Sequence, residues 1–137
     1  MTGVTSFAAG ASALAVAAVL MTVPSDAAEP SYGRLGARDG TLLSGCHNYR
    51  YRYRVATPTN DWTLETFLRD PSGETIASGA YFSDSDPGVD DATFRFCRFG
   101  TRPGVFTIWA KVHWYDDHGD EHVGRLTPTR FRLSRPR

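Results

Sequence analysis

The pattern that most limits the fold is an alternation of aromatic and basic side chains over residues 47–55. Tyr49, Tyr51, Tyr53 and Val55 occupy every second position, and three arginines lie between them. Successive side chains of a β-strand point to opposite faces. The segment therefore predicts a strand that turns its tyrosines toward a core and its arginines toward water.

Further segments with this two-residue period are separated by Gly, Pro, Asp and Asn, and no long run has apolar residues at helical spacing. They predict six more strands, at 62–69, 75–82, 92–97, 105–115, 122–126 and 129–133. The side chains expected to face the core are Trp62, Leu64, Thr66, Leu68, Phe94, Phe96, Phe106, Ile108, Ala110, Val112 and Trp114. About seven short strands at this spacing predict an all-β chain folded as an antiparallel β-sandwich.

The amino-terminal segment has the features of a secretory signal. The run Phe7–Val23 is apolar, rich in alanine and uncharged, and Ser25 and Ala27 satisfy the small-x-small rule for signal peptidase. We expect residues 1–27 to be a signal peptide that is cleaved after Ala27, which would make the protein secreted and extracellular. No basic residue precedes Arg34, so either the true start codon lies upstream or the signal is atypical. Because the run is near the minimum length that crosses a bilayer, a retained anchor is the alternative.

Beyond this segment, residues 28–40 are expected to form a flexible, glycine-containing stretch, and residues 41–137 a single domain large enough for a core. The full chain of 137 residues has 15 basic and 15 acidic side chains, for a net charge of zero. This balance gives no argument for a nucleic-acid partner, and we expect none. We also expect no stable membrane insertion after signal cleavage, and a monomer.

The chain contains two cysteines, Cys46 and Cys97. An even pair in a secreted chain of this size predicts one disulfide. A metal thiolate pair or a catalytic thiol is the competing interpretation, but two isolated cysteines lack the paired spacing of a zinc site. We therefore expect a Cys46–Cys97 bond.

Two motifs resemble bacterial extracellular immunoglobulin-like modules, as found in small secreted bacterial proteins of the actinobacterial type. One is the turn Asp70-Pro71-Ser72-Gly73 between two strands, and the other is the strand that begins Pro103-Gly104-Val105-Phe106-Thr107-Ile108-Trp109-Ala110-Lys111-Val112. The resemblance covers Cys46 to Leu133 and implies an immunoglobulin-like sandwich. Because these are turn and core patterns, they say almost nothing about activity.

Two polar segments are candidates for binding a metal ion. The hairpin tip carries Asp116, His118, Asp120 and His122, which are potential zinc ligands. The acidic loop 83–91 carries Asp84, Asp86, Asp90 and Asp91, whose oxygens would suit calcium. Neither segment matches an established metal signature, and solvated turns need the same residue types.

No catalytic motif is present: the sequence has no Gly-x-Ser-x-Gly elbow, no His-Glu-x-x-His and no phosphate-binding loop. Arg50, Arg52 and Arg54 are either a solvated face or a binding surface for an anionic partner. We expect a secreted, non-enzymatic binding or structural module that recognises a protein or glycan and has no cofactor other than a possible calcium or zinc ion. The alternatives are a metal-binding secreted protein and a secreted enzyme inhibitor that presents loop 83–91 or 98–104.

Overall fold

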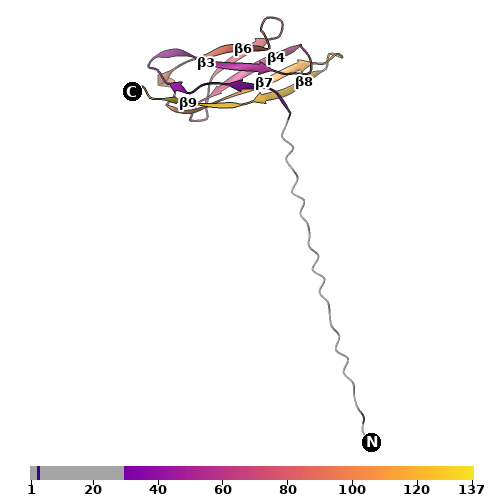
Figure 1. Cartoon of the computed structure of the whole chain (residues 1–137), viewed down its shortest axis with the longest axis horizontal. Helices are drawn as coiled ribbons and strands as arrows, with labels where there is room; N and C mark the ends of the chain where they lie inside the picture. The colour runs from indigo at the N-terminus through magenta and orange to yellow at the C-terminus, as the bar shows by residue number, and fades with distance from the viewer. Residues whose placement is uncertain (1–2, 4–29) are drawn as a thin grey trace.

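The computed structural model describes Gly3 and residues 30–137 of the chain. Within these residues the protein is all-β and sandwich-like, with one short 3-10 turn and no α-helix (Figure 1). No helix in the described part is long and apolar enough to cross a membrane. The predicted signal peptide, residues 1–27, lies outside the described residues apart from Gly3.

The strands follow the predicted alternation closely. They are β1 (Ser31–Gly36), β2 (Gly40–Thr41), β3 (Cys46–Val55), β4 (Trp62–Arg69), β5 (Thr75–Phe82), β6 (Val89–Cys97), β7 (Gly104–Tyr115), β8 (Glu121–Thr127) and β9 (Thr129–Ser134), with the 3-10 turn η1 (Arg98–Gly100) between β6 and β7. The bounds of β4 and β5 are those predicted from the sequence. The other five predicted strands are each longer by one to three residues.

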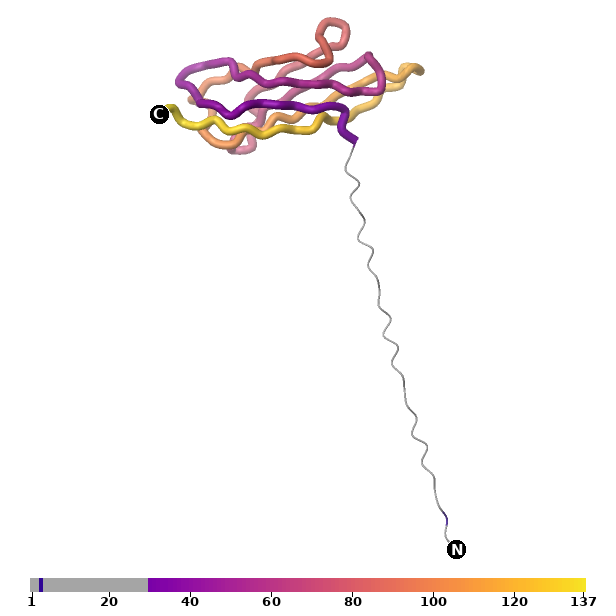
Figure 2. Tube along the Cα trace, in the orientation of Figure 1, coloured from indigo at the N-terminus to yellow at the C-terminus, as the bar shows by residue number. Residues whose placement is uncertain are grey.

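The strands form two layers. In one layer β3 lies between β1 and β6 and is antiparallel to both. In the other, β4 lies between β5 and β7, and the far side of β7 pairs first with β9 and then with β8. β1 also pairs in parallel with β8, which joins the two layers along one side. Figure 2 shows the indigo amino-terminal strand running beside the yellow carboxyl-terminal segment.

The amino-terminal border of the domain differs from the prediction. Residues 28–40 were expected to be flexible, yet β1 lies inside this segment and is hydrogen-bonded to β3 and β8. Gly33 has φ of +133°, and a Cβ at this position would approach the Arg54 carbonyl oxygen to 1.9 Å. This glycine therefore permits close contact between two strands rather than flexibility.

The core lies between the two layers, and the predicted inward faces are confirmed. Every second side chain of β7 from Phe106 to Trp114 is buried, as are Trp62, Leu64, Thr66 and Leu68 of β4 and Phe94 and Phe96 of β6. On β3, Tyr51 and Tyr53 are buried while the intervening arginines are exposed. Ring stacking adds to the burial, with the centroids of Tyr51 and Phe94 4.2 Å apart.

A small hydroxyl cluster is buried in this core. The Tyr51 hydroxyl shares hydrogen bonds of 2.8 Å with both Thr66 Oγ1 and the Tyr81 hydroxyl. Gly79 leaves the space for these oxygens, since a Cβ there would lie 2.9–3.2 Å from all three. Polar groups inside a core are stabilising only when they are paired in this way.

Candidate functional site

The outer face of β1, β3 and β6 carries the candidate binding surface, which we call the arginine face. It consists of Arg34, Arg38, Arg50, Arg52, Arg54, Arg95 and one acid, Asp91, among the described residues. Because the tyrosines of β3 enter the core, Arg50, Arg52 and Arg54 must point outward, as predicted. The strand register places Arg34 directly opposite Arg54 and Asp91 directly opposite Arg52.

Three of these arginines were not identified from the sequence. Arg34 lies on β1, and Arg38 lies just beyond this strand, in the segment expected to be flexible. Arg95 alternates with the buried Phe94 and Phe96, so its outward direction was readable from the pattern. Its position beside β3 could not be predicted from the sequence, because only the pairing of β6 with β3 brings Arg95 to this face.

The arginine face is hollowed along the boundary between β1 and β3. One open hollow of about 550 Å³ is lined by Gly36, Ala37, Arg38, Arg50, Tyr51, Arg52 and Asp91. A second of about 190 Å³ is lined by Arg34, Leu35, Gly36, Arg52, Tyr53, Arg54 and Val89. Both hollows include Gly36 and Arg52, so they adjoin one another and form a single groove. A Cβ added to Gly36 would meet no atom within 4 Å, which leaves open space above this residue.

The electrostatics of this face are unbalanced. Arg52 Nη1 lies 3.2 Å from Asp91 Oδ1, and both side chains are largely exposed. An exposed ion pair of this kind contributes about 1 kcal/mol at most. Like charges directly opposite in a sheet destabilise it by a similar amount, so the Arg34–Arg54 pair opposes the pairing of β1 with β3. The excess of positive charge on the arginine face therefore does not stabilise the fold, and stability does not explain it.

The acidic residues predicted as calcium ligands do not converge. Asp86 accepts a hydrogen bond from the Phe82 backbone N–H, which closes the turn after β5. Strand β6 begins at Val89, so Asp90 and Asp91 lie on a strand and not in the loop, and as neighbours they point to opposite faces. Asp84 is exposed on the remaining loop.

The hairpin tip between β7 and β8 is organised by hydrogen bonds within the tip. Asp116 accepts hydrogen bonds from the backbone N–H groups of His118 and Asp120 and from His122 Nε2, at 2.9–3.0 Å. The hydrogen bond from His122, with those from the backbone, lowers the pKa of the Asp116 carboxyl. Within residues 30–137, no group of three or more His, Cys, Asp or Glu side chains is placed to hold a metal ion. Metal binding at either segment stays a prediction.

The tryptophans are not free stacking surfaces for a sugar. Trp62 is only 7% exposed. Trp109 lies on the outer face of β7, but the Phe67 ring stacks on it at 4.2 Å and the Arg125 guanidinium lies 5.9 Å from its centroid.

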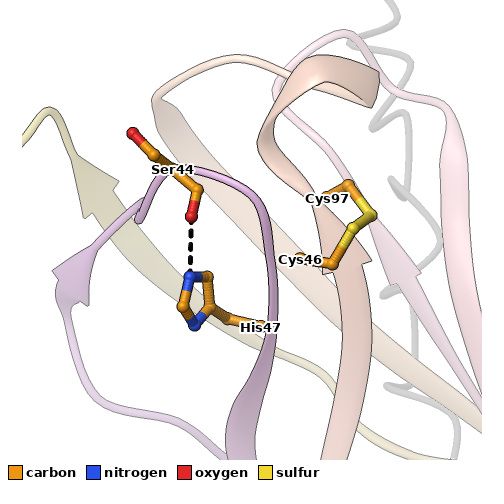
Figure 3. The surroundings of a disulfide bond; sticks show 4 residues. All are labelled: Ser44, Cys46, His47 and Cys97. Atoms are coloured by element: carbon orange, nitrogen blue, oxygen red, sulfur yellow. Dashed lines mark hydrogen bonds between the residues drawn. A yellow bond between two sulfur atoms is a disulfide. The ribbon is translucent and has the colours of Figure 1, made fainter.

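The disulfide lies at the end of the first layer, and the predicted Cys46–Cys97 bond is confirmed (Figure 3). The two cysteines are directly opposite in the β3–β6 pair, so the bond is within one sheet and not between the layers. His47 turns its ring toward the preceding loop, where Nε2 donates to the Ser44 carbonyl at 2.7 Å (Figure 3).

Loop 98–104 follows directly from the disulfide and projects one aromatic side chain. Phe99 is 91% exposed. The loop around it is fixed, because the Arg98 N–H donates to the Gly45 carbonyl and the Thr101 hydroxyl donates to buried Asp70 at 2.8 Å. Asp70 also accepts hydrogen bonds from the N–H groups of Ser72 and Glu74, as expected for the turn that it begins.

Comparison with known proteins finds no family model and no curated protein that matches this chain.

Proposed function

We propose that this protein is a secreted, non-enzymatic binding module that recognises an anionic glycan or protein outside the cell through the arginine face. The observation that carries the proposal is the gathering of six arginines with one acid on one face of a chain whose net charge is zero. Arginine is suited to this role because its planar guanidinium donates two parallel hydrogen bonds to a carboxylate, sulfate or phosphate group. The disulfide supports an oxidising, extracellular location.

We further propose that the sandwich is of the immunoglobulin-like type. In that type the second and fifth strands share one layer and the third, sixth and seventh share the other. If the two-residue strand β2 is left out of the count, β3 and β6 are the second and fifth strands, and β4, β7 and β8 are the third, sixth and seventh. The pairing of β3 with β6, and of β7 with both β4 and β8, supports this assignment. Constant-type antibody domains differ in two respects. Their disulfide joins the two layers, and their fourth strand lies in the layer of the second and fifth strands, whereas β5 here pairs with β4.

An equilibrium titration with a fluorescent heparin-derived oligosaccharide tests the anionic partner. Replacing Arg50, Arg52 and Arg54 together by Gln should weaken binding by about tenfold or more, since a hydrogen bond to a charged group contributes on the order of 1.5 kcal/mol. The matched control replaces Arg69, Arg130 and Arg132 by Gln, which removes the same charge from the outer face of the other layer. Equal loss in both variants would leave net charge, and not the arginine face, as the cause.

A second candidate function is inhibition of a secreted peptidase by loop 98–104. Phe99 favours it, because an exposed aromatic side chain on a fixed loop is the kind of residue that anchors a protein interface. Purified protein should then inhibit at least one peptidase of the trypsin, chymotrypsin or subtilisin type, and Phe99→Ala should abolish the effect. Phe82→Ala is the control, since Phe82 is also an exposed phenylalanine but lies at the end of β5. The absence of inhibition across this panel would remove the second candidate.

A further inference from the structure

We infer that the ligand of the arginine face is a linear polyanion, which lies along β3 in the groove above Gly36. The inference rests on the proposed function and adds to it the shape of the ligand and its place on the face. Its basis is the arrangement of five of the six arginines along the two adjoining hollows; Arg95 lines neither hollow.

The cations are spread in a row and do not converge on a point. Residues two apart on a strand are separated by about 7 Å, so Arg50, Arg52 and Arg54 extend over about 14 Å of β3. Arg38 lines the groove at one end, beside Arg50, and Arg34 lines it at the other, beside Arg54. A single small anion could contact only one or two of these groups, whereas a chain of oxyanions could contact them in succession.

The floor of the groove is suited to an extended chain because it lacks side chains at its centre. Gly36 is opposite Arg52 in the β1–β3 pair, and a side chain that began at Gly36 would find no atom within 4 Å of its Cβ. Both hollows include these two residues, so the groove is continuous past this point. A bulky residue at position 36 would divide the groove in two without removing any charge.

A bound polyanion would also relieve the charge imbalance of the face. Arg34 and Arg54 are direct cross-strand neighbours, and an oxyanion between their guanidinium groups would convert a repulsive pair into a bridged one. Asp91, the one acid of this face among the described residues, is already paired with Arg52 and leaves the other arginines available. Binding should therefore be strong at low salt and weaken steeply as salt increases.

The test measures binding of three linear polyanions: inorganic polyphosphate, heparin and polygalacturonate. Each is compared with a short anion of the same chemistry, at about 50 and 200 mM salt, the interval over which polyanion contacts weaken most visibly. We expect at least one polymer to bind about tenfold more tightly than its short counterpart, because several contacts are made by one molecule. Which polymer binds identifies phosphate, sulfate or carboxylate as the recognised group.

Three variants locate the bound chain. Gly36→Trp fills the groove and keeps every charge, so it should weaken polymer binding by about tenfold. Arg50→Gln should weaken it by a similar factor, because it removes a groove-lining arginine that is not paired with Asp91. Arg130→Gln removes the same charge from the opposite layer and should change affinity by less than about twofold. Thermal unfolding checks that each variant folds. Should Gly36→Trp not fold, Gly36→Gln places a smaller side chain over the same floor and should give an intermediate loss.

The outcomes separate the inference from the proposed function. If Arg50→Gln weakens binding while the folded Gly36 variants bind like the wild type, the arginine face binds anions outside the groove and the inference is wrong. A short anion that binds as tightly as its polymer would also overturn it, in favour of a small-anion site. If no polymer and no short anion binds at low salt, both the inference and the proposed anionic partner fall.

Discussion

The hydroxyl cluster of Tyr51, Thr66 and Tyr81 leads to a prediction about how two buried side chains depend on each other. Tyr51→Phe removes the central hydroxyl and with it two hydrogen bonds of 2.8 Å. Thr66, which has no exposed surface, then keeps only a 3.5 Å contact with the Gly79 carbonyl. The variant thus loses two bonds and leaves one buried hydroxyl poorly paired.

The expected magnitudes follow from these contacts. Two hydrogen bonds at about 1 kcal/mol each, with a further contribution from the poorly paired Thr66 hydroxyl, give a loss of about 2–3 kcal/mol for Tyr51→Phe. Thr66→Val removes one of the same bonds and should cost about 1–1.5 kcal/mol, because Tyr51 keeps its bond to Tyr81. The double variant should cost little more than Tyr51→Phe alone, since removing both partners leaves no orphaned hydroxyl in Thr66.

Urea denaturation of the four proteins measures the free energies of unfolding and yields the coupling energy between the two sites. We expect a coupling of about 1 kcal/mol or more. Tyr49→Phe is the control: its hydroxyl accepts a bond from the exposed Leu43 N–H, so its removal should cost about 0.5 kcal/mol. Losses that add within about 0.3 kcal/mol would show that the hydroxyls act independently, and would refute the reasoning.

Three further predictions concern the stability of the domain. Replacing Cys46 and Cys97 together by Ala should lower the free energy of unfolding by about 4 kcal/mol, because the bond closes a loop with a sequence separation of 51. A loss below about 1 kcal/mol in a urea titration would contradict this prediction. Trp114→Ala should cost about 3–5 kcal/mol in the same assay, since the side chain is 6% exposed, and a nearly neutral result would mean that the buried face of β7 is misassigned. Burial raises the pKa of Tyr53 to about 12 and also raises the pKa of Tyr51. Between pH 10 and 12 the unfolded chain therefore loses phenolic protons that the folded protein retains. Stability should therefore fall by up to about 1.4 kcal/mol per pH unit for each of these tyrosines, and a flat profile of stability across that interval would be the contrary result.

Much of the fold was predictable because the alternation of apolar and polar residues within each strand indicates which side faces the core. The alternation in β3, β4 and β7 gave both the strand and its buried face, since a two-residue period has only one interpretation when one side is apolar. The disulfide was predictable because the chain contains only two cysteines, which allow a single pairing.

Other features depend on which strands are neighbours, and the local sequence does not encode this. β1 is short and contains Gly33 and Gly36, so its alternation is weak, and its partners lie far along the chain. The groove on the arginine face could not be predicted without placing β1, because Arg34 and Gly36 form one side of this groove. The hairpin tip illustrates the converse limit: Asp116 and His122 are of residue types that bind metal ions, but they hydrogen-bond each other.

The parallel pairing of β1 with β8, and of β2 with β9, has a consequence for how the chain reaches its native state. Strands at the beginning of the domain are hydrogen-bonded to strands at its end, with Ser31 opposite Arg125 and Thr41 opposite Ser134. Contacts of such high sequence separation make folding slow, on the order of milliseconds to seconds for all-β domains. A chain that emerges amino terminus first cannot complete its sandwich until nearly its whole length is available. Loss of the last strand, β9, would therefore leave β2 without its partner. Nascent chains would depend on protection from aggregation until β8 and β9 have been synthesised.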